Sequence, residues 1–236
     1  METIAHIALE SASQIVLYDD EFGRNYFVSL SFSICLSVAR ALLMSGLLLL
    51  FALVLAVFVV VVNNRWVTGI TQIVVDALES VPVYVWILAA ISWSNQGGYV
   101  LVALVFSVAG LPLCYNFIYA RAREIQYQVY YFSAIALGAG RWRLSRYHIL
   151  PNLLPSCGSL VIHIFGSAMA VYGAVGLFGF VNREEYDLGV MLLRGKEQAA
   201  LTIVPLVLAT IGYGFVFIVL YFGVKRFDER RFNGVG

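Results

Sequence analysis

The stretch ALLMSGLLLLFALVLAVFVVVV, residues Ala41–Val62, contains no charged side chain and decides the class of fold. An α-helix rises about 1.5 Å per residue, so about 20 mostly apolar residues cross the hydrocarbon core of a bilayer. Ala41–Val62 meets that requirement. The sequence therefore predicts a membrane-spanning helix at this position.

The rest of the chain repeats this pattern. Three more uncharged apolar runs are long enough to cross a membrane: Tyr99–Tyr119, Leu153–Val181 and Ala199–Val224. A fifth predicted span, Thr68–Trp93, carries Asp76 and Glu79 close to one end. We therefore expect an all-α, polytopic transmembrane bundle of about five spans.

Composition agrees with a lipid environment. Hydrophobic residues make up 61% of the 236 residues and charged residues only 12%, about half the charged share of an ordinary soluble domain. Cys35, Cys114 and Cys157 lie in or beside apolar runs without ligand-like spacing, so we expect small buried thiols and neither a disulfide framework nor a zinc site.

Upstream of the first span, Tyr26–Ala39 is also apolar but is interrupted by serines. Joined to Ala41–Val62, it is too long for a single crossing, so we predict an interfacial helix that leads into the membrane. A sixth span is the alternative. The acidic segment Met1–Leu17 resembles neither a signal peptide nor a span. We divide the chain into an N-terminal segment, 1–40, and a transmembrane domain, 41–236.

The positive charges predict the orientation. Five spans place the loop 120–151, the loop 63–67 and the C-terminus on one side, which holds most of the Lys and Arg residues. The positive-inside rule makes this side cytoplasmic and leaves the N-terminus outside. The basic residues on the predicted cytoplasmic side are Arg65, Arg121, Arg123, Arg141, Arg143, Arg146, Lys225, Arg226, Arg230 and Arg231.

The loop 120–151 is the sizeable cytoplasmic connection. Tyr127, Tyr130, Tyr131 and Ala134 recur at helical spacing, and the small-residue turn Leu137–Gly140 follows them. Gly138 supplies a turn without a Cβ penalty. Pro151 and Pro155 suit the first turn of a new helix. The pattern predicts a short helix, a sharp turn and a re-entry into the membrane.

This loop carries a resemblance to a known family. The segments Ser133–Gly140 (SAIALGAG) and His148–Pro155 (HILPNLLP) resemble the EAA loop of ABC importer permeases, in the version found in the dipeptide/oligopeptide/nickel class. The order of further segments agrees with that class over most of the chain. These segments are Asp20–Asn25, then Asp76 with Ser80 and Pro82, and Gly173–Gly179. Phe132 and Ile135 depart from the family pattern, which has an acidic residue and an arginine there.

The resemblance implies a type I importer permease with a cytoplasmic coupling helix, in the inner (plasma) membrane of a prokaryote. It implies four kinds of partner: a second homologous permease, two ATPase subunits, an extracytoplasmic substrate-binding protein and membrane lipid. No nucleic acid is expected. A peptide-like or metal-complex substrate is implied. The residues expected to couple to the ATPase are Tyr130, Tyr131, Ser133, Ala134, Ala136, Leu137, Gly138, Ala139 and Arg141.

No enzymatic motif is recognisable in the chain. A G-x-x-x-x-G-K-[ST] loop is absent, and Gly195-Lys196 lacks both the upstream glycine and the following Ser or Thr. We expect no catalytic, metal or cofactor site here, with ATP bound and hydrolysed on the partner subunits.

Several readings stay open at this point. Residues proposed to line the pathway are Ser167, Met169, Tyr172 and Gly173, although glycines such as Gly173 more often allow close helix packing. His163, inside a span, is more simply a neutral histidine bonded to a neighbouring helix. Alternatives for the whole chain are an ABC permease for amino acids or antimicrobial peptides, and a secondary transporter, which would favour internal repeats and midplane carboxylates.

Overall fold

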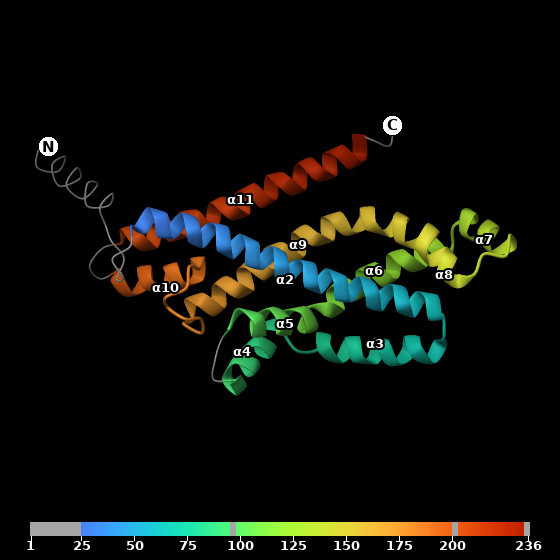
Figure 1. Cartoon of the computed structure of the whole chain (residues 1–236), viewed down its shortest axis with the longest axis horizontal. Helices are drawn as coiled ribbons and strands as arrows, with labels where there is room; N and C mark the ends of the chain where they lie inside the picture. The colour runs from blue at the N-terminus through green and yellow to red at the C-terminus, as the bar shows by residue number, and fades with distance from the viewer. Residues whose placement is uncertain (1–24, 95–97, 200–202, 234–236) are drawn as a thin grey trace, which may run out of the picture. The chain divides into compact units, whose positions relative to one another are not determined.

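The computed structural model describes residues 25–94, 98–199 and 203–233. Predictions for the N-terminus and for most of Asp20–Asn25 fall outside the described residues. Within those ranges the regular elements are helices, and the predicted all-α class is confirmed (Figure 1). They are α2 (Tyr26–Val62), α3 (Arg65–Glu79), α4 (Val83–Ser94), α5 (Tyr99–Ala109), α6 (Leu111–Gln126), α7 (Val129–Ala136), α8 (Arg141–Leu144), the π-helical turn η1 (Ser145–Ile149), α9 (Leu150–Leu177), α10 (Leu188–Gln198) and α11 (Val204–Asn233).

Helix α2 is longer than any span predicted for it. The sequence suggests that Tyr26–Ala39 and Ala41–Val62 are separate segments, but the structure joins them in one unbroken helix. Serine does not interrupt it, because Ser31 Oγ donates to the Phe27 carbonyl one turn back (2.8 Å) and so stays within the helix. The interfacial position of residues 26–39 remains a prediction.

Three helical segments are long and apolar enough to cross a membrane: Tyr26–Val62, Leu160–Leu177 and Val204–Gly223. Two bent pairs pass the same test together, α3 with α4 at 79° and α5 with α6 at 43°. Prolines begin the second helix of each pair, since Pro82 precedes α4 and Pro112 lies in the first turn of α6. Counting each bent pair as one span gives the five spans that the sequence predicts.

The bend between α3 and α4 changes where two carboxylates lie. The sequence places Asp76 and Glu79 near one end of a span, but they belong to the last turn of α3, beside the break in the middle of the bent pair. Gln72 Nε2 donates to Asp76 Oδ1 (2.8 Å), and Asn116 Nδ2 of α6 donates to Glu79 Oε2 (3.3 Å). These carboxylates are thus bonded to amides of α3 and α6.

The membrane re-entry after α7 also differs in detail. The prolines do not start a new helix: the helix begins at Arg141 and passes through η1 directly into α9, with Pro155 inside it. Leu150 N–H donates to the Ser145 carbonyl, five residues back, as in a π-helix. Proline lacks the N–H that an α-helix needs, so the irregular turn lies directly before Pro151.

The described residues form two compact units, and the division at residue 40 remains a prediction. Among the described residues, the first unit lies within 25–41 and 169–222, and the second within 42–168 and 223–233. In the first, Tyr26, Met191 and Ala209 form a buried cluster, and Tyr26 Oη donates to the Pro205 carbonyl (2.7 Å). In the second, α2 buries Met44, Leu48, Ala52 and Ala56, which lie on one face at intervals of one turn.

Candidate functional site

The segment between α6 and α9 forms a short helix closed by a glycine turn. Gln128 is extended and precedes α7, and Gly138 adopts a positive φ of 80° just after it. Gly138 N–H donates to the Ile135 carbonyl (2.9 Å) and Ala139 N–H to the Ala134 carbonyl (3.1 Å). This pair of bonds satisfies carbonyls that the end of the helix leaves open, and only glycine enters that backbone region without strain. The predicted short helix and turn are confirmed.

Helix α7 has no buried residue within the described chain. Its exposed side chains are largely apolar: Val129 is 80% exposed and Leu137, just after the helix, is 89% exposed. Phe132 and Ile135 are exposed as well. A contiguous apolar surface at a projecting turn is unfavourable in water and is typical of a protein interface.

The residues predicted to couple to an ATPase gather on this segment but face two ways. Tyr130, Ser133, Ala136, Leu137, Gly138 and Arg141 are exposed, whereas Tyr131, Ala134 and Ala139 are half-buried. Tyr131 turns away from solvent and accepts a hydrogen bond from Gln126 Nε2 (3.4 Å). Tyr130 instead approaches the ring of His148, with centroids 6.1 Å apart. Their role in coupling remains a prediction.

Two anchors connect the segment to neighbouring helices of its unit. Arg141 Nη1 donates to the carbonyl of Val62, the last residue of α2 (2.9 Å). Leu144 and Ser145 are buried and hold the start of the re-entering helix. A displacement of α7 would therefore reach α2 through Arg141 and α9 through a continuous helix.

Sequence reasoning missed part of this surface. Phe132 and Ile135 were departures from a charged family pattern, yet both contribute exposed apolar area beside Leu137. The sequence does indicate this surface, because apolar residues in a loop that faces water are typical of a protein interface. The contributions of Gln126 and of the Val62 carbonyl depend on tertiary contacts, which no local pattern reveals.

The pathway candidates lie in the C-terminal part of α9, Ser167 in the second unit and the other three in the first. Met169 and Tyr172 are buried, and Gly173 is buried too, whereas Ser167 is exposed. Tyr213 Oη donates to the Met169 carbonyl (2.7 Å), and a Cβ on Gly173 would overlap the Tyr213 ring. Gly173 thus permits close packing of α9 and α11. A role of these four residues in a pathway remains a prediction.

The outward face of α9 carries small and polar residues. His163 and Ser167 are exposed one turn apart, and Ala170 follows on the same face. The prediction that His163 bonds to a neighbouring helix does not describe this chain, in which its side chain is exposed. An exposed ionisable side chain within a span needs a protein partner or water beside it, because lipid would solvate it poorly.

A buried carboxylate organises the other end of the first unit. Asp187 caps α10, and its Oδ1 accepts the N–H groups of Gly189 (2.7 Å) and Val190 (3.2 Å). Its Oδ2 accepts the hydroxyl of Ser37 in α2 (2.9 Å), and Ser37 Oγ accepts the Leu188 N–H (3.0 Å). Burial raises the pKa of Asp187, against the opposing effects of these hydrogen bonds and of the Arg40 charge.

Arg40 joins α2 to the segment before α10. Its guanidinium forms a salt bridge with Glu185 (3.0 Å), lies 3.9 Å from Asp187 and donates to the Tyr186 carbonyl (3.2 Å). The same group lies over the Tyr172 ring, 5.5 Å from its centroid. Sequence reasoning assigned no role to Arg40 or Asp187.

The described residues contain no cluster of potential metal ligands. In residues 25–94, 98–199 and 203–233, no three His, Cys, Asp or Glu side chains gather closely enough to hold one. The three cysteines are free thiols. Cys114 and Cys157 are buried as expected, but Cys35 is exposed, so its predicted burial is wrong for this chain.

Comparison with known proteins identifies the family. The family model described as "Binding-protein-dependent transport system inner membrane component" matches residues 28–233. None of the curated proteins matches the chain. Among solved structures, an inward-facing form of the MetNI methionine ABC transporter has the same fold, with a TM-score of 0.70 and 14% identity over 84% of this chain and 94% of that one. Because the family model covers most of the sequence, this chain belongs to the inner membrane components of binding-protein-dependent transport systems, the permease subunits of ABC importers.

Proposed function

We propose that this permease docks an ATPase subunit through α7 and the Gly138 turn, and forms half of a translocation pathway with a second homologous permease. Two ATPase subunits and an extracytoplasmic binding protein complete the importer, and the C-terminus is cytoplasmic. The observation that carries the proposal is the apolar helix α7, which has no buried residue among those described and is followed by the Gly138 turn. Such a surface fits a groove on a partner protein.

The connections of α7 support a mechanical role. Leu137 and Phe132 offer apolar contact area, whereas Arg141 anchors the following turn to the end of α2. Closure of two ATPases on ATP would move the two docked helices together. Since α8, η1 and α9 are continuous, that movement would shift a membrane helix and not only a loop.

The outward face of α9 supports a second permease as partner. His163 and Ser167 are exposed in the isolated chain, and a partner or a water-filled path between two permeases would solvate them better than lipid. This arrangement favours Ser167 over Met169, Tyr172 and Gly173 as a residue that lines the path.

The substrate class rests on the resemblance of the loop 120–151 to the dipeptide/oligopeptide/nickel class. We propose a short peptide or a metal complex. The alternative is an amino acid, since the structural neighbour is a methionine transporter, although identity of 14% carries only the fold.

Uptake into proteoliposomes tests this function. The complex is purified from native membranes through a tag on this chain, reconstituted with its binding protein, and given labelled di- and tripeptides, a nickel chelate or methionine. We expect ATP-dependent accumulation of a peptide or of the chelate. Accumulation of methionine alone would replace the proposed substrate class. ATP-driven import by this complex would be refuted if none of these substrates accumulated although ATP is hydrolysed. It would also be refuted if uptake proceeded without ATP.

A further inference from the structure

One face of helix α9 is polar although it lies within a predicted span. Asn152, His163 and Ser167 are exposed and Ser156 is half-buried. Intervals of four and seven residues separate them in turn, which places all four on one side of the helix. Beyond Leu154, no large apolar side chain of α9 is exposed among those that the structure describes. The exposed face of α9 is therefore made of polar and small residues.

The exposed face of α11 has the opposite character. It presents Val207, Ile211 and Phe215, which follow one another at intervals of about one turn. Such side chains are stable in hydrocarbon, whereas amide, imidazole and hydroxyl groups lose their hydrogen bonds to water there. At 1.5 Å per residue the polar face of α9 is about 22 Å long from Asn152 to Ser167. A face of this length needs water or a polar solute beside it.

The hydrogen bonds of this face leave mainly acceptors available. The Ser167 hydroxyl donates to the His163 carbonyl (3.0 Å), and Asn152 Nδ2 donates to the His148 carbonyl (2.7 Å). Ser167 Oγ and Asn152 Oδ1 keep lone pairs after these bonds. Within the described part of the chain, the His163 imidazole has no partner, and it can accept or donate.

The charge of the face selects the kind of solute that it suits. Residues 152–167 contain no Asp, Glu, Lys or Arg. A free divalent cation would find none of the carboxylate ligands that it prefers, and an anion would find no guanidinium or ammonium group. A row of neutral acceptors instead complements N–H donors, such as the amide and amino groups of a short peptide.

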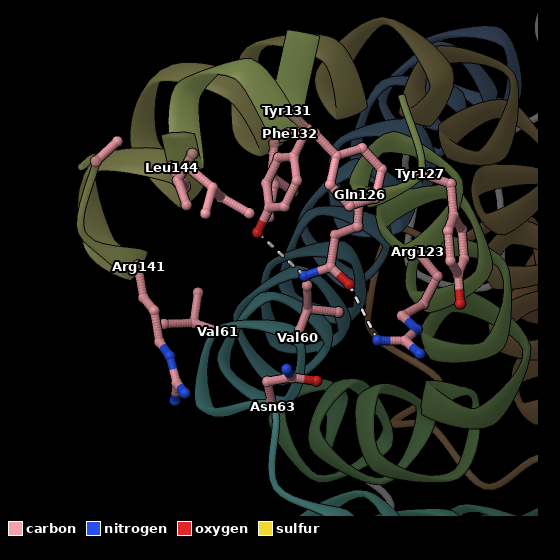
Figure 2. Close-up of a pocket in the computed structure, with 13 residues that line it drawn as sticks. Val60, Val61, Asn63, Arg123, Gln126, Tyr127, Tyr131, Phe132, Arg141 and Leu144 are labelled. Carbon is pink, nitrogen blue, oxygen red and sulfur yellow. Dashed lines mark hydrogen bonds between the residues drawn. The ribbon is translucent and has the colours of Figure 1, made fainter. Parts of the chain in front are cut away.

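Movement at the coupling segment can reach this face. Helices α8 and α9 are joined without a break through η1. Arg141 and Leu144, at the start of this continuous helix, border a cavity of about 330 Å³ that the ends of α2 and α6 also line (Figure 2). Close-packed interiors resist movement, so this space lets the start of the helix shift when α7 is displaced.

We infer that the substrate crosses the membrane along the polar face of α9, that His163 determines specificity there, and that this face takes a solute rich in N–H donors, namely a short peptide. The inference rests on the proposed import function. Of the two substrates proposed there, it selects the peptide over the metal complex. Asn152 and Ser167 supply acceptors on either side of His163.

Thiol labelling tests whether the face is wet. Ser167→Cys and Ile211→Cys are made separately in a Cys35→Ser chain, since Cys35 is the exposed native thiol and the other two are buried. The assembled complex in native membranes is treated with a charged maleimide. Because the thiolate reacts and forms only in water, we expect Ser167→Cys to label about tenfold faster than Ile211→Cys.

A substrate preference tests the role of His163. Reconstituted complexes import a dipeptide and its N-methylated analogue with the same binding protein, so a change in preference belongs to this chain. We expect His163→Ala with Ser167→Ala to lower the preference for the dipeptide about fivefold, the equivalent of one neutral hydrogen bond. His163→Gln, which keeps a donor and an acceptor, should retain most of it. Ser31→Ala is the matched control, because Ser31 is also exposed and also donates to a carbonyl one turn back.

Each experiment has an outcome that overturns the inference. If Ser167→Cys labels no faster than Ile211→Cys, the face lies against lipid or against the second permease and carries no substrate. If the double variant keeps the native preference, or if Ser31→Ala loses as much, the assigned substrate class is wrong. Labelling needs no transport, so it decides whether the face is wet even if failed uptake refutes the import function. Should the double variant fail to assemble, Ser167→Cys and His163→Gln decide.

Discussion

Asp187 joins α10 to α2 through one buried carboxylate that accepts hydrogen bonds from both helices. We expect Asp187→Ala to lower the free energy of unfolding by about 2 kcal/mol, because it removes a helix cap and leaves the buried Ser37 hydroxyl without its acceptor. Asp187→Asn keeps one oxygen and should cost less. Thermal unfolding in detergent measures both.

A surface carboxylate provides the control. Glu197 pairs with Arg183 at the surface (2.6 Å), and Glu197→Ala should change the free energy of unfolding by less than about 1 kcal/mol. If Asp187→Ala were as mild as Glu197→Ala, the buried network would not hold α10 to α2.

The raised pKa of Asp187 predicts a dependence on pH. Its ordinary value is 3.8, and burial raises it in the folded chain. The folded chain therefore binds this proton more tightly than the unfolded chain does. Between the ordinary and the raised pKa, the free energy of unfolding falls as pH rises.

Comparison with Asp187→Asn isolates this effect, because the variant keeps both charged neighbours of Asp187, Glu185 and Arg40, in place. Melting temperatures are measured from about pH 4 upward. We expect the native chain to lose stability relative to the variant as pH rises. The raised pKa of Asp187 would be contradicted if the melting temperatures of the two proteins changed in parallel with pH. It would also be contradicted if the native chain became more stable relative to the variant as pH rises.

Sequence alone predicts the role of a single residue only where the backbone conformation requires that residue type. Gly138 stands out because a turn after a short helix requires a positive φ, and the structure has it there. Nothing local distinguishes Arg40 in α2, or Asp187 in the segment before α10, from the other charged residues. Their roles come from contacts between residues of α2 and residues about 150 positions later in the chain.

The end of helix α7 depends on the backbone of Gly138. We expect Gly138→Ala to cost about 1–2 kcal/mol, since its φ of 80° is strained for a residue with a Cβ. Gly140→Ala is the matched control, because its φ is −68° and a Cβ there meets nothing within 4 Å. Thermal unfolding should separate the two variants, and equal melting temperatures would argue against the turn.

The packing of α10 against α9 depends on Gly189. A Cβ there would overlap the Gly173 backbone carbonyl and lie 2.9 Å from Asp187 Oδ1. Backbone moves less readily than a side chain, so Gly189→Ala should cost about 1–3 kcal/mol.

Gly214 in α11 is the comparison site, since a Cβ there meets nothing within 4 Å. Gly214→Ala should leave stability unchanged or raise it by up to about 1 kcal/mol, as helix propensity predicts. If Gly189→Ala unfolds at the temperature of Gly214→Ala, α10 does not approach α9 this closely.

Helices were predictable from sequence where a long apolar run decides them, as in Ala41–Val62 within α2 and in the apolar part of α11, which begins at Val204. Their breaks were not. Pro82 bends the α3–α4 pair by 79°, whereas Pro155 remains inside α9, although both follow apolar residues. Tertiary packing decides whether a proline ends a helix or is accommodated, and periodicity does not contain that information.

For the whole molecule, composition and the loop 120–151 were sufficient to predict a polytopic permease, and the family match confirms it. The exact lining of the pathway was not predictable, because two chains are expected to form it and one sequence contains neither the partner nor its register. Three of the four candidates are buried within this chain, which leaves Ser167 as the exposed one.

The central claim is that α7 and its glycine turn dock the ATPase. A pull-down from detergent-solubilised native membranes tests it, comparing the tagged native chain with Ala134→Asp plus Gly138→Asp and with the control Gly140→Ala. The native chain and the control should bring down an ATPase and a second permease, whereas the double variant should insert, keep the permease and lose most of the ATPase. The claim would be contradicted if the double variant recovered the ATPase in full. It would also be contradicted if neither the native chain nor either variant recovered an ATPase although the two permeases stayed together.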